Sequence, residues 1–124
     1  MLQEIVLLNG LYDVLCSLCI LQIINIKLIG NLHKSMIKQS LQNNKLYCRI
    51  LGFFILLYGL IRIFGNTYTI SISYLIESLY YLNELHIGTV DKKKSIFVIT
   101  TSGIMCLYLF DFFDFFYFFI SIKY

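Results

Sequence analysis

The sequence of 124 residues contains no proline, no tryptophan and no alanine. Ile, Phe, Tyr, Lys and Asn are abundant instead, and we attribute this bias to AT-rich codons, which say more about the genome than about the fold. Charged residues are also scarce, at 14%, against 59% hydrophobic residues and a mean hydropathy of +0.78. These values lie outside the usual range of soluble domains, so a membrane protein is the expected class.

Basic residues are too few for a nucleic-acid-binding protein. The net charge is +3, and the basic residues cluster in two loops without interleaved aromatic residues, so no nucleic-acid partner is expected. No basic residue precedes the first apolar run, whose first charge is Glu4. We therefore expect no cleavable signal peptide, and we expect this run to stay in the mature protein.

The chain also lacks the residue patterns that carry catalysis or hold cofactors. It has no HExxH, no glycine-rich phosphate loop and no nucleophile placed beside a base. Cys16 and Cys19 form a CxxC, but they lie in an apolar helical run, where they are better interpreted as small apolar side chains than as a metal or redox site. We therefore predict no enzyme activity, no cofactor and no metal ion.

Four apolar segments are each predicted to cross about 30 Å of hydrocarbon as a helix. They cover residues 5–28, 47–64, 68–82 and 95–120. The third begins with TYTISISYLI, an alternation that suits a strand in water; in a membrane a lone strand leaves its backbone hydrogen bonds unsatisfied, so a helix is predicted. The predicted fold is an all-α membrane bundle of four transmembrane helices, forming one domain over residues 1–124.

Lysines set the expected orientation of this bundle. One loop carries Lys34, Lys38 and Lys45, and the loop at residues 92–94 carries three more lysines. With four spans these two loops share one face, while both termini and the Gly65-Asn66 turn share the other. The positive-inside rule then places the two basic loops in the cytoplasm.

One face of the second segment is predicted to pack closely against a neighbouring helix. Gly52 and Gly59 lie seven residues apart and therefore share a helical face, which Arg62 extends. Because arginine is costly inside a bilayer, Arg49 and Arg62 are each expected near an end of the segment or against a partner. Arg49 is predicted to pair with Glu84 at the cytoplasmic interface.

At the opposite end, Asp111 and Asp114 lie three residues apart on the last segment, on the side that also carries Arg62. No histidine accompanies them at that depth, so ion pairing with Arg62 is predicted rather than metal binding or acid–base chemistry.

Polar residues inside the bilayer form two predicted stripes. Tyr74, Glu77 and Tyr81 recur at helical spacing on the third segment, and Asn9 and Asp13 do so on the first. Both stripes should face the bundle interior, with Asp13 and Glu77 at similar depth. The two polar stripes have two interpretations: they form a structural network, or they line part of an ion or substrate path.

Four stretches carry a family resemblance: RILGFFILL at residues 49–57, IR at 61–62, YLIESLYYLNE at 74–84 and VITTS at 98–102. Over residues 49–110 their order resembles the ergosterol-biosynthesis scaffold family, small four-span proteins of the endoplasmic reticulum. Members of that family are non-catalytic and tether sterol C-4 demethylation enzymes to one another. The resemblance implies an endoplasmic reticulum location and a contact surface formed by the glycine face and the stripe on the third segment.

The function expected from the sequence is therefore a non-catalytic, multi-pass scaffold or assembly factor that contacts membrane lipids and other membrane proteins. Two alternatives stay open. The chain could be a structural membrane protein of a large DNA virus, in the virion or in a host internal membrane, since such short, biased chains are typical there. It could also be a small transporter or lipid-binding protein built on Asp13 and Glu77.

Overall fold

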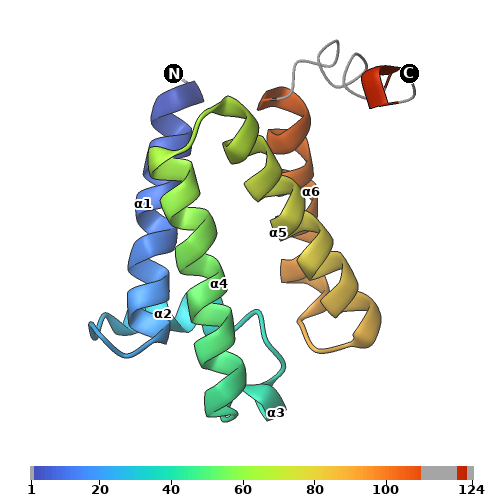
Figure 1. Cartoon of the computed structure of the whole chain (residues 1–124). Coiled ribbons are helices and arrows are strands. Elements are labelled where there is room, and N and C mark those ends of the chain that lie inside the picture. Colours follow the sequence, from blue (N-terminus) through green and yellow to red (C-terminus); the bar gives the residue numbers. More distant parts are fainter. Residues whose placement is uncertain (1, 110–119, 123–124) are drawn as a thin grey trace.

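The computed structural model describes residues 2–109 and 120–122, and the predicted all-α class is confirmed there. The helices, labelled in Figure 1, are α1 (Leu2–Ile20), α2 (Lys27–Lys34), α3 (Gln39–Gln42), α4 (Lys45–Phe64), α5 (Thr67–Ile87) and α6 (Lys92–Leu109). Among the described residues, Ile37 and Val90 form an isolated antiparallel β-bridge.

Short polar residues mark where the long helices begin and end. The side chains of Asn44 and Asn66 accept hydrogen bonds from backbone N–H groups in the first turns of α4 and α5. Asp91 does the same for the backbone N–H of Lys94 at the start of α6, at 3.1 Å. Gly88 ends α5 in the left-handed conformation, with φ of 93°, which glycine adopts without strain.

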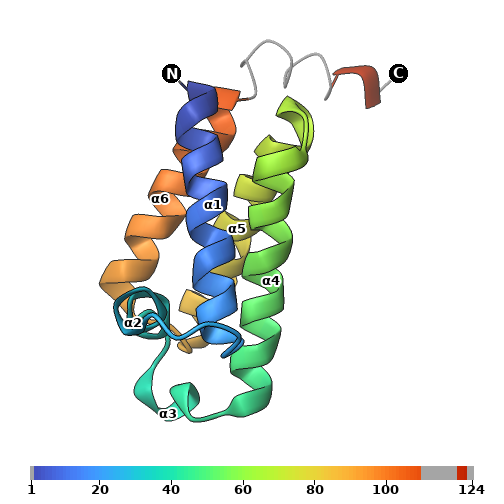
Figure 2. The ribbon, with the colours of Figure 1, turned by 90° about the vertical axis from the view of Figure 1, so that its left-hand side faces the viewer.

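The four long helices form two antiparallel pairs. α1 packs along α4, and α5 packs along α6, whereas α4 and α5 share a smaller contact. The pairs stand side by side in Figure 1, and Figure 2 shows α1 beside α4 with α5 behind them. The N-terminus and the turn at residues 65–66 lie at one end, and α2, α3 and the loop between α5 and α6 lie at the other (Figure 1). The two lysine-bearing loops therefore share one end of the molecule.

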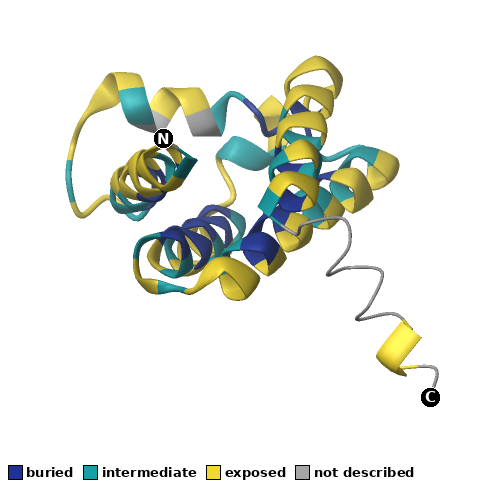
Figure 3. Ribbon diagram, turned by 90° about the horizontal axis from the view of Figure 1, so that it is seen from above, coloured by how far each residue is buried: buried dark blue, intermediate teal, exposed yellow. Residues whose placement is uncertain are grey.

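The core lies on the sides of the helices that face one another (Figure 3). Between α1 and α4 it contains Ile20, Leu51, Ile55 and Tyr58, of which Ile55 is completely buried. A smaller cluster of Val6, Tyr74 and Cys106 connects α1 to α5 and α6.

Hydrogen bonds join the two loops at the lysine-bearing end. The N–H of Lys38 donates to the carbonyl of Thr89 at 2.9 Å, and the N–H of Asp91 donates to the carbonyl of Met36 at 2.7 Å. These bonds flank the bridge between Ile37 and Val90. The segment after α2 is therefore hydrogen-bonded to the loop between α5 and α6.

Some predicted segment boundaries are wrong. The first segment, predicted over residues 5–28, ends at Ile20, after which the chain turns through Gln22 in the left-handed conformation and starts the separate helix α2. At 19 residues α1 is already about 28 Å long, so it needs no further residues to match a bilayer. The third segment, predicted over 68–82, continues to Ile87, where Gly88 ends it.

The other two segments agree more closely with prediction. α4 covers the predicted 47–64 and begins two residues earlier. α6 begins three residues before the predicted start at 95, and its predicted continuation over residues 110–119 lies outside the described residues.

Among the described helices, α1 and α4 are long and apolar enough to cross a membrane. This is consistent with a membrane protein. The stricter prediction of four spans also needs α5, which carries several polar residues, and α6 to cross the membrane.

Candidate functional site

A buried arginine in the last turn of α4 connects three helices. Arg62 on α4 is 2% exposed, and its Nη1 donates to Asp13 at 2.5 Å and to Asn9 at 2.9 Å, both on α1. Its Nη2 donates to Glu77 on α5, and its Nε donates to the hydroxyl of Ser73 at 3.3 Å. We call Asn9, Asp13, Arg62, Ser73 and Glu77 the ion cluster. It is the main polar link between the two helix pairs.

Two tyrosine rings enclose the guanidinium of this cluster. The carbon Cζ of Arg62 lies 3.7 Å from the centre of the Tyr74 ring and 4.5 Å from that of Tyr58. Such cation–π contacts are strongest where water is excluded. The Tyr74 hydroxyl also donates to Asn9 at 3.1 Å, so the ring and the cluster hold each other in place.

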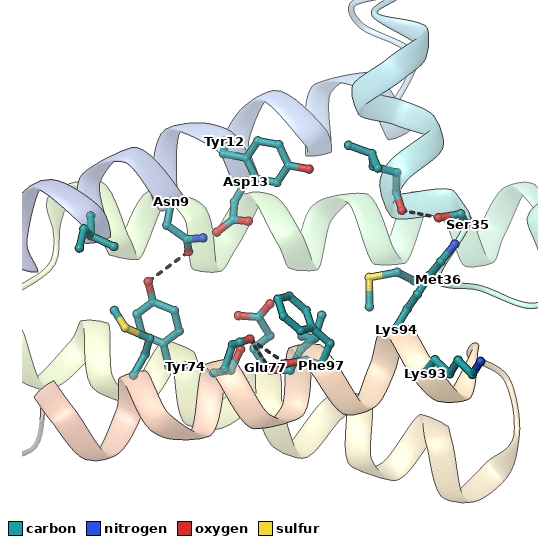
Figure 4. Close-up of a pocket in the computed structure, with 16 residues that line it drawn as sticks. Asn9, Tyr12, Asp13, Ser35, Met36, Tyr74, Glu77, Lys93, Lys94 and Phe97 are labelled. Atoms are coloured by element: carbon teal, nitrogen blue, oxygen red, sulfur yellow. Dashed lines mark hydrogen bonds between the residues drawn. The ribbon is translucent and has the colours of Figure 1, made fainter.

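The cluster contains two carboxylates and one guanidinium. Asp13 and Glu77 each use one oxygen to bind Arg62, and both residues are buried, with exposures of 3% and 8%. Both carboxylates point into the space between the helix pairs (Figure 4).

Glycines allow α1 and α4 to approach closely enough for this pairing. A Cβ atom on Gly59 would lie 3.0 Å from the Cβ of Asp13, and one on Gly10 would lie 3.0 Å from the Cβ of Arg62 and from the carbonyl oxygen of Gly59. These distances are too short for an unrelaxed side chain. The two glycines therefore set the separation at which Arg62 reaches Asp13.

A cavity of about 600 Å³ adjoins the cluster and extends toward the lysine-bearing end. Its walls come from α1, α5, α6 and the segment that follows α2, and they are mostly apolar (Figure 4). Asn9, Asp13, Tyr74 and Glu77 lie along its inner wall. We call this space the loop-end cavity.

A second cavity, of about 590 Å³, lies at the opposite end of the bundle. It is bordered by the first turns of α1, by the turn at residues 65–66 and by Arg62 itself. Because Arg62 lines this turn-end cavity while Asp13 and Glu77 line the loop-end cavity, the ion cluster lies between the two.

The residues of the two predicted polar stripes turn inward. Asn9 and Asp13 on α1 and Tyr74 and Glu77 on α5 meet in and around the ion cluster. Tyr81, which continues the α5 stripe, is 3% exposed and packs with Met36 and Val90 in a separate cluster at the lysine-bearing end.

The neighbour of the predicted glycine face belongs to the same chain. A Cβ on Gly52 would lie 2.9 Å from the side chain of Leu21, and one on Gly59 would meet Asp13 and Gly10 of α1. Gly52, Gly59 and Arg62 are all buried. Their helix-packing role is therefore observed, but a role as a contact surface for another protein is not, because α1 and the residues just after it already cover this face.

The predicted pair between Arg49 and Glu84 does not form. The Arg49 side chain is exposed, and Glu84 accepts hydrogen bonds from the hydroxyls of Thr89 and, at 3.4 Å, Tyr47. Equal depth did not bring the two residues together because Arg49 lies on the outer side of α4, next to the buried Cys48.

The prediction for Arg62 also needs correction. It was expected to mark the edge of the bilayer and to pair with Asp111 and Asp114, but it is buried between Asp13 and Glu77. Asp111 and Asp114 themselves lie outside the described residues.

Sequence reasoning missed several residues that build the site. Gly10 and Ser73 belong to the same helical faces as Asp13 and Glu77, so the periodicity that singled out the carboxylates could have found them. Lys93 and Lys94 line the loop-end cavity, although the sequence indicated only a basic loop. Their position depends on how α6, packed along α5, is placed relative to α1, for which the sequence holds no signal.

In the part of the chain that the structure describes, no group of three His, Cys, Asp or Glu side chains is placed to hold a metal ion. Over the described residues, fold and site together define an all-helical protein with two possible membrane-spanning helices and a buried ion cluster. Comparisons with families of known proteins, with individual characterised proteins and with solved structures find no match to this chain.

Proposed function

We propose that this chain is an integral membrane protein whose four long helices cross the bilayer and whose loop-end cavity binds an amphipathic small molecule. The observation that carries the proposal is the cavity itself. Its volume of about 600 Å³ lies within the range of known ligand sites, and it combines mostly apolar walls with a few converging polar groups. Bundles of helices commonly build ligand sites in this way, between facing helices.

The outer surface of the helices supports the membrane part of the proposal. Large apolar side chains such as Leu8 on α1, Phe53 on α4, Leu79 on α5 and Leu107 on α6 are more than half exposed. A soluble monomer rarely exposes so much contiguous apolar surface, whereas lipid solvates it without cost. The polar residues of the ion cluster lie inside the bundle and pair with one another, as charges within a membrane do.

The distribution of lysines gives the proposed orientation. Lys34, Lys38 and Lys45 lie at the same end as the lysines of residues 92–94, and this end is assigned to the cytoplasm. Cysteines introduced at Lys45 and Lys92 should react with an impermeant maleimide from the same side of sealed vesicles. Reaction from opposite sides would contradict the four-span topology.

Ligand binding is tested by filling the cavity. Thr101 lines the loop-end cavity, and the neighbouring Thr100 on the same helix does not. The two are closely matched, since each is exposed and each donates its hydroxyl to a backbone carbonyl four residues earlier. Thr101→Trp should abolish displacement of a fluorescent alkyl probe by hexadecanol or palmitate in phosphatidylcholine nanodiscs, and Thr100→Trp should not.

Equal binding by the two variants would place the ligand elsewhere. If the unmodified protein binds neither hexadecanol nor palmitate, the proposed function itself is refuted.

A scaffold function is the second candidate, and a stripe on α4 favours it. Ile50, Phe53, Leu57, Leu60 and Phe64 recur every three or four residues and are all exposed. This spacing suits the packing of another helix. A scaffold would therefore contact its partner through this outer stripe rather than through the glycine face.

Replacing Phe53 and Leu57 together by Ala should then reduce recovery of sterol C-4 demethylation enzymes from endoplasmic reticulum membranes. Replacing Ile72 and Leu79, exposed apolar residues of α5, gives the matched control. Unchanged recovery with the α4 variant would remove this candidate.

A further inference from the structure

The mouth of the loop-end cavity is positively charged. Lys93 and Lys94 lie in the first turn of α6 and line the cavity, and both are exposed. Figure 4 shows Lys94 extending across the opening toward Ser35 on the opposite wall. The nearest acidic residue in the sequence, Asp91, does not line this cavity, and its carboxylate accepts the backbone N–H of Lys94.

Inside the mouth, the α6 wall is largely apolar. Phe97, Val98 and Met105 line this wall, and Ile5 of α1 also borders the cavity. From Lys94 to Met105 the helix advances 11 residues, or about 16 Å. This is about half of the 30 Å hydrocarbon core of a bilayer, which is the depth reached by one acyl chain from one leaflet.

The ion cluster gives the cavity a direction. Asp13 and Glu77 on the inner wall already bind Arg62, so the cations that line the cavity and are available to an anionic group are Lys93 and Lys94 at the mouth. The lysines attract the same group at the mouth, where the proposed topology also places the lipid headgroups. An amphiphile with an anionic head is therefore favoured in a single orientation.

We infer that the loop-end cavity binds a long-chain fatty acid, with its carboxylate at Lys93 and Lys94 and its chain between α1, α5 and α6. This inference rests on the proposed function and specifies the ligand class. Charge complementarity selects the anionic head, the length of the apolar wall sets the length of the chain, and the volume of about 600 Å³ favours one chain over two.

The test compares two ligands that differ only in the charge of the head. Palmitate and hexadecanol are titrated against a fluorescent alkyl probe bound to the full chain in phosphatidylcholine nanodiscs. Palmitate should bind at least about tenfold more tightly, the difference expected for a charge-assisted hydrogen bond. Replacing Lys93 and Lys94 together by Met should remove this preference and leave hexadecanol binding within about twofold.

Lys92 and Lys45 provide the matched control. Both are exposed lysines that do not line the loop-end cavity, so replacing them by Met together changes the net charge equally. This control should keep the preference for palmitate. Loss of the preference in the control as well would show that it reflects overall charge, and it would overturn the inference.

The outcomes separate the inference from the proposed function. If hexadecanol binds as tightly as palmitate, or if the Lys93 and Lys94 variant keeps the preference, the anionic assignment is wrong while amphiphile binding stands. Tighter binding of dioleoyl phosphatidic acid than of palmitate would overturn the single-chain assignment. If neither single-chain ligand binds, both proposals fail.

Discussion

Replacing Arg62 by Met is the sharpest test of how the two helix pairs are held together. The change preserves much of the apolar volume of the side chain but removes the guanidinium shared by Asp13 and Glu77. Both carboxylates would then be buried without a counter-charge, and two tyrosine rings would lose a cation.

The expected cost follows from the imbalance of charge. Removing one partner of a buried ion pair typically costs about 3–5 kcal/mol, because the remaining charge stays desolvated. This corresponds to about a hundredfold or more in the folding equilibrium. Replacing all three groups at once, with Asp13→Asn, Arg62→Met and Glu77→Gln, leaves no unpaired charge and should recover most of the loss.

The measurement is reversible unfolding in mixed micelles of dodecyl maltoside and sodium dodecyl sulfate, followed by circular dichroism. Arg49→Met supplies the control, since Arg49 is an exposed arginine on the same helix, and it should change the stability by less than about 0.5 kcal/mol. Two results would refute the reasoning: an Arg62→Met protein as stable as the Arg49→Met protein, or a triple variant no more stable than Arg62→Met alone.

Three further predictions concern packing, loops and helix ends. Gly59→Ala should destabilise the protein by about 1–3 kcal/mol through overpacking, whereas Gly103→Ala, whose Cβ would lie 3.8 Å from its nearest neighbour, should not; equal effects in thermal unfolding would contradict the close approach of α1 and α4. Ile37→Cys with Val90→Cys should form a disulfide under mild oxidation, because a non-hydrogen-bonded antiparallel pair has Cα atoms about 4.5 Å apart; a persistent free-thiol count would argue against the bridge. Asn66→Ala should cost about 0.5–2 kcal/mol in the same unfolding assay by removing the cap of α5, and a neutral effect would disprove the cap.

The polar face of each helix was predictable from the sequence. The spacing of Tyr74, Glu77 and Tyr81 placed all three inward, and that of Asn9 and Asp13 did the same on α1. These predictions needed only the period of a helix and the cost of a charge in lipid. The glycine face was equally predictable, although the sequence could not tell whether its neighbour was α1 or another protein.

The partner of Arg62 could not be predicted from depth alone. Counted from the turn at residues 65–66, Arg62 and Glu77 differ by eight residues, or about 12 Å along the helices. Side chains lean toward the N-terminus of their own helix, so in this antiparallel pair Arg62 leans away from the turn and Glu77 leans toward it. The two long side chains meet between their levels. An estimate of depth that counts only Cα positions from the turn does not include this convergence of the two side chains.

The ion cluster also constrains the order in which the chain can enter a membrane. In the proposed topology α4 carries Arg62 in its last turn, where its buried guanidinium is costly without a counter-charge. One counter-charge, Asp13, is synthesised earlier on α1, and the other, Glu77, emerges only with α5. α1 must therefore still be close to the insertion site when α4 leaves it, and α4 gains its second counter-charge only when α5 follows as the other arm of a hairpin. The arginine that holds the finished bundle together thus also makes its biosynthesis sequential.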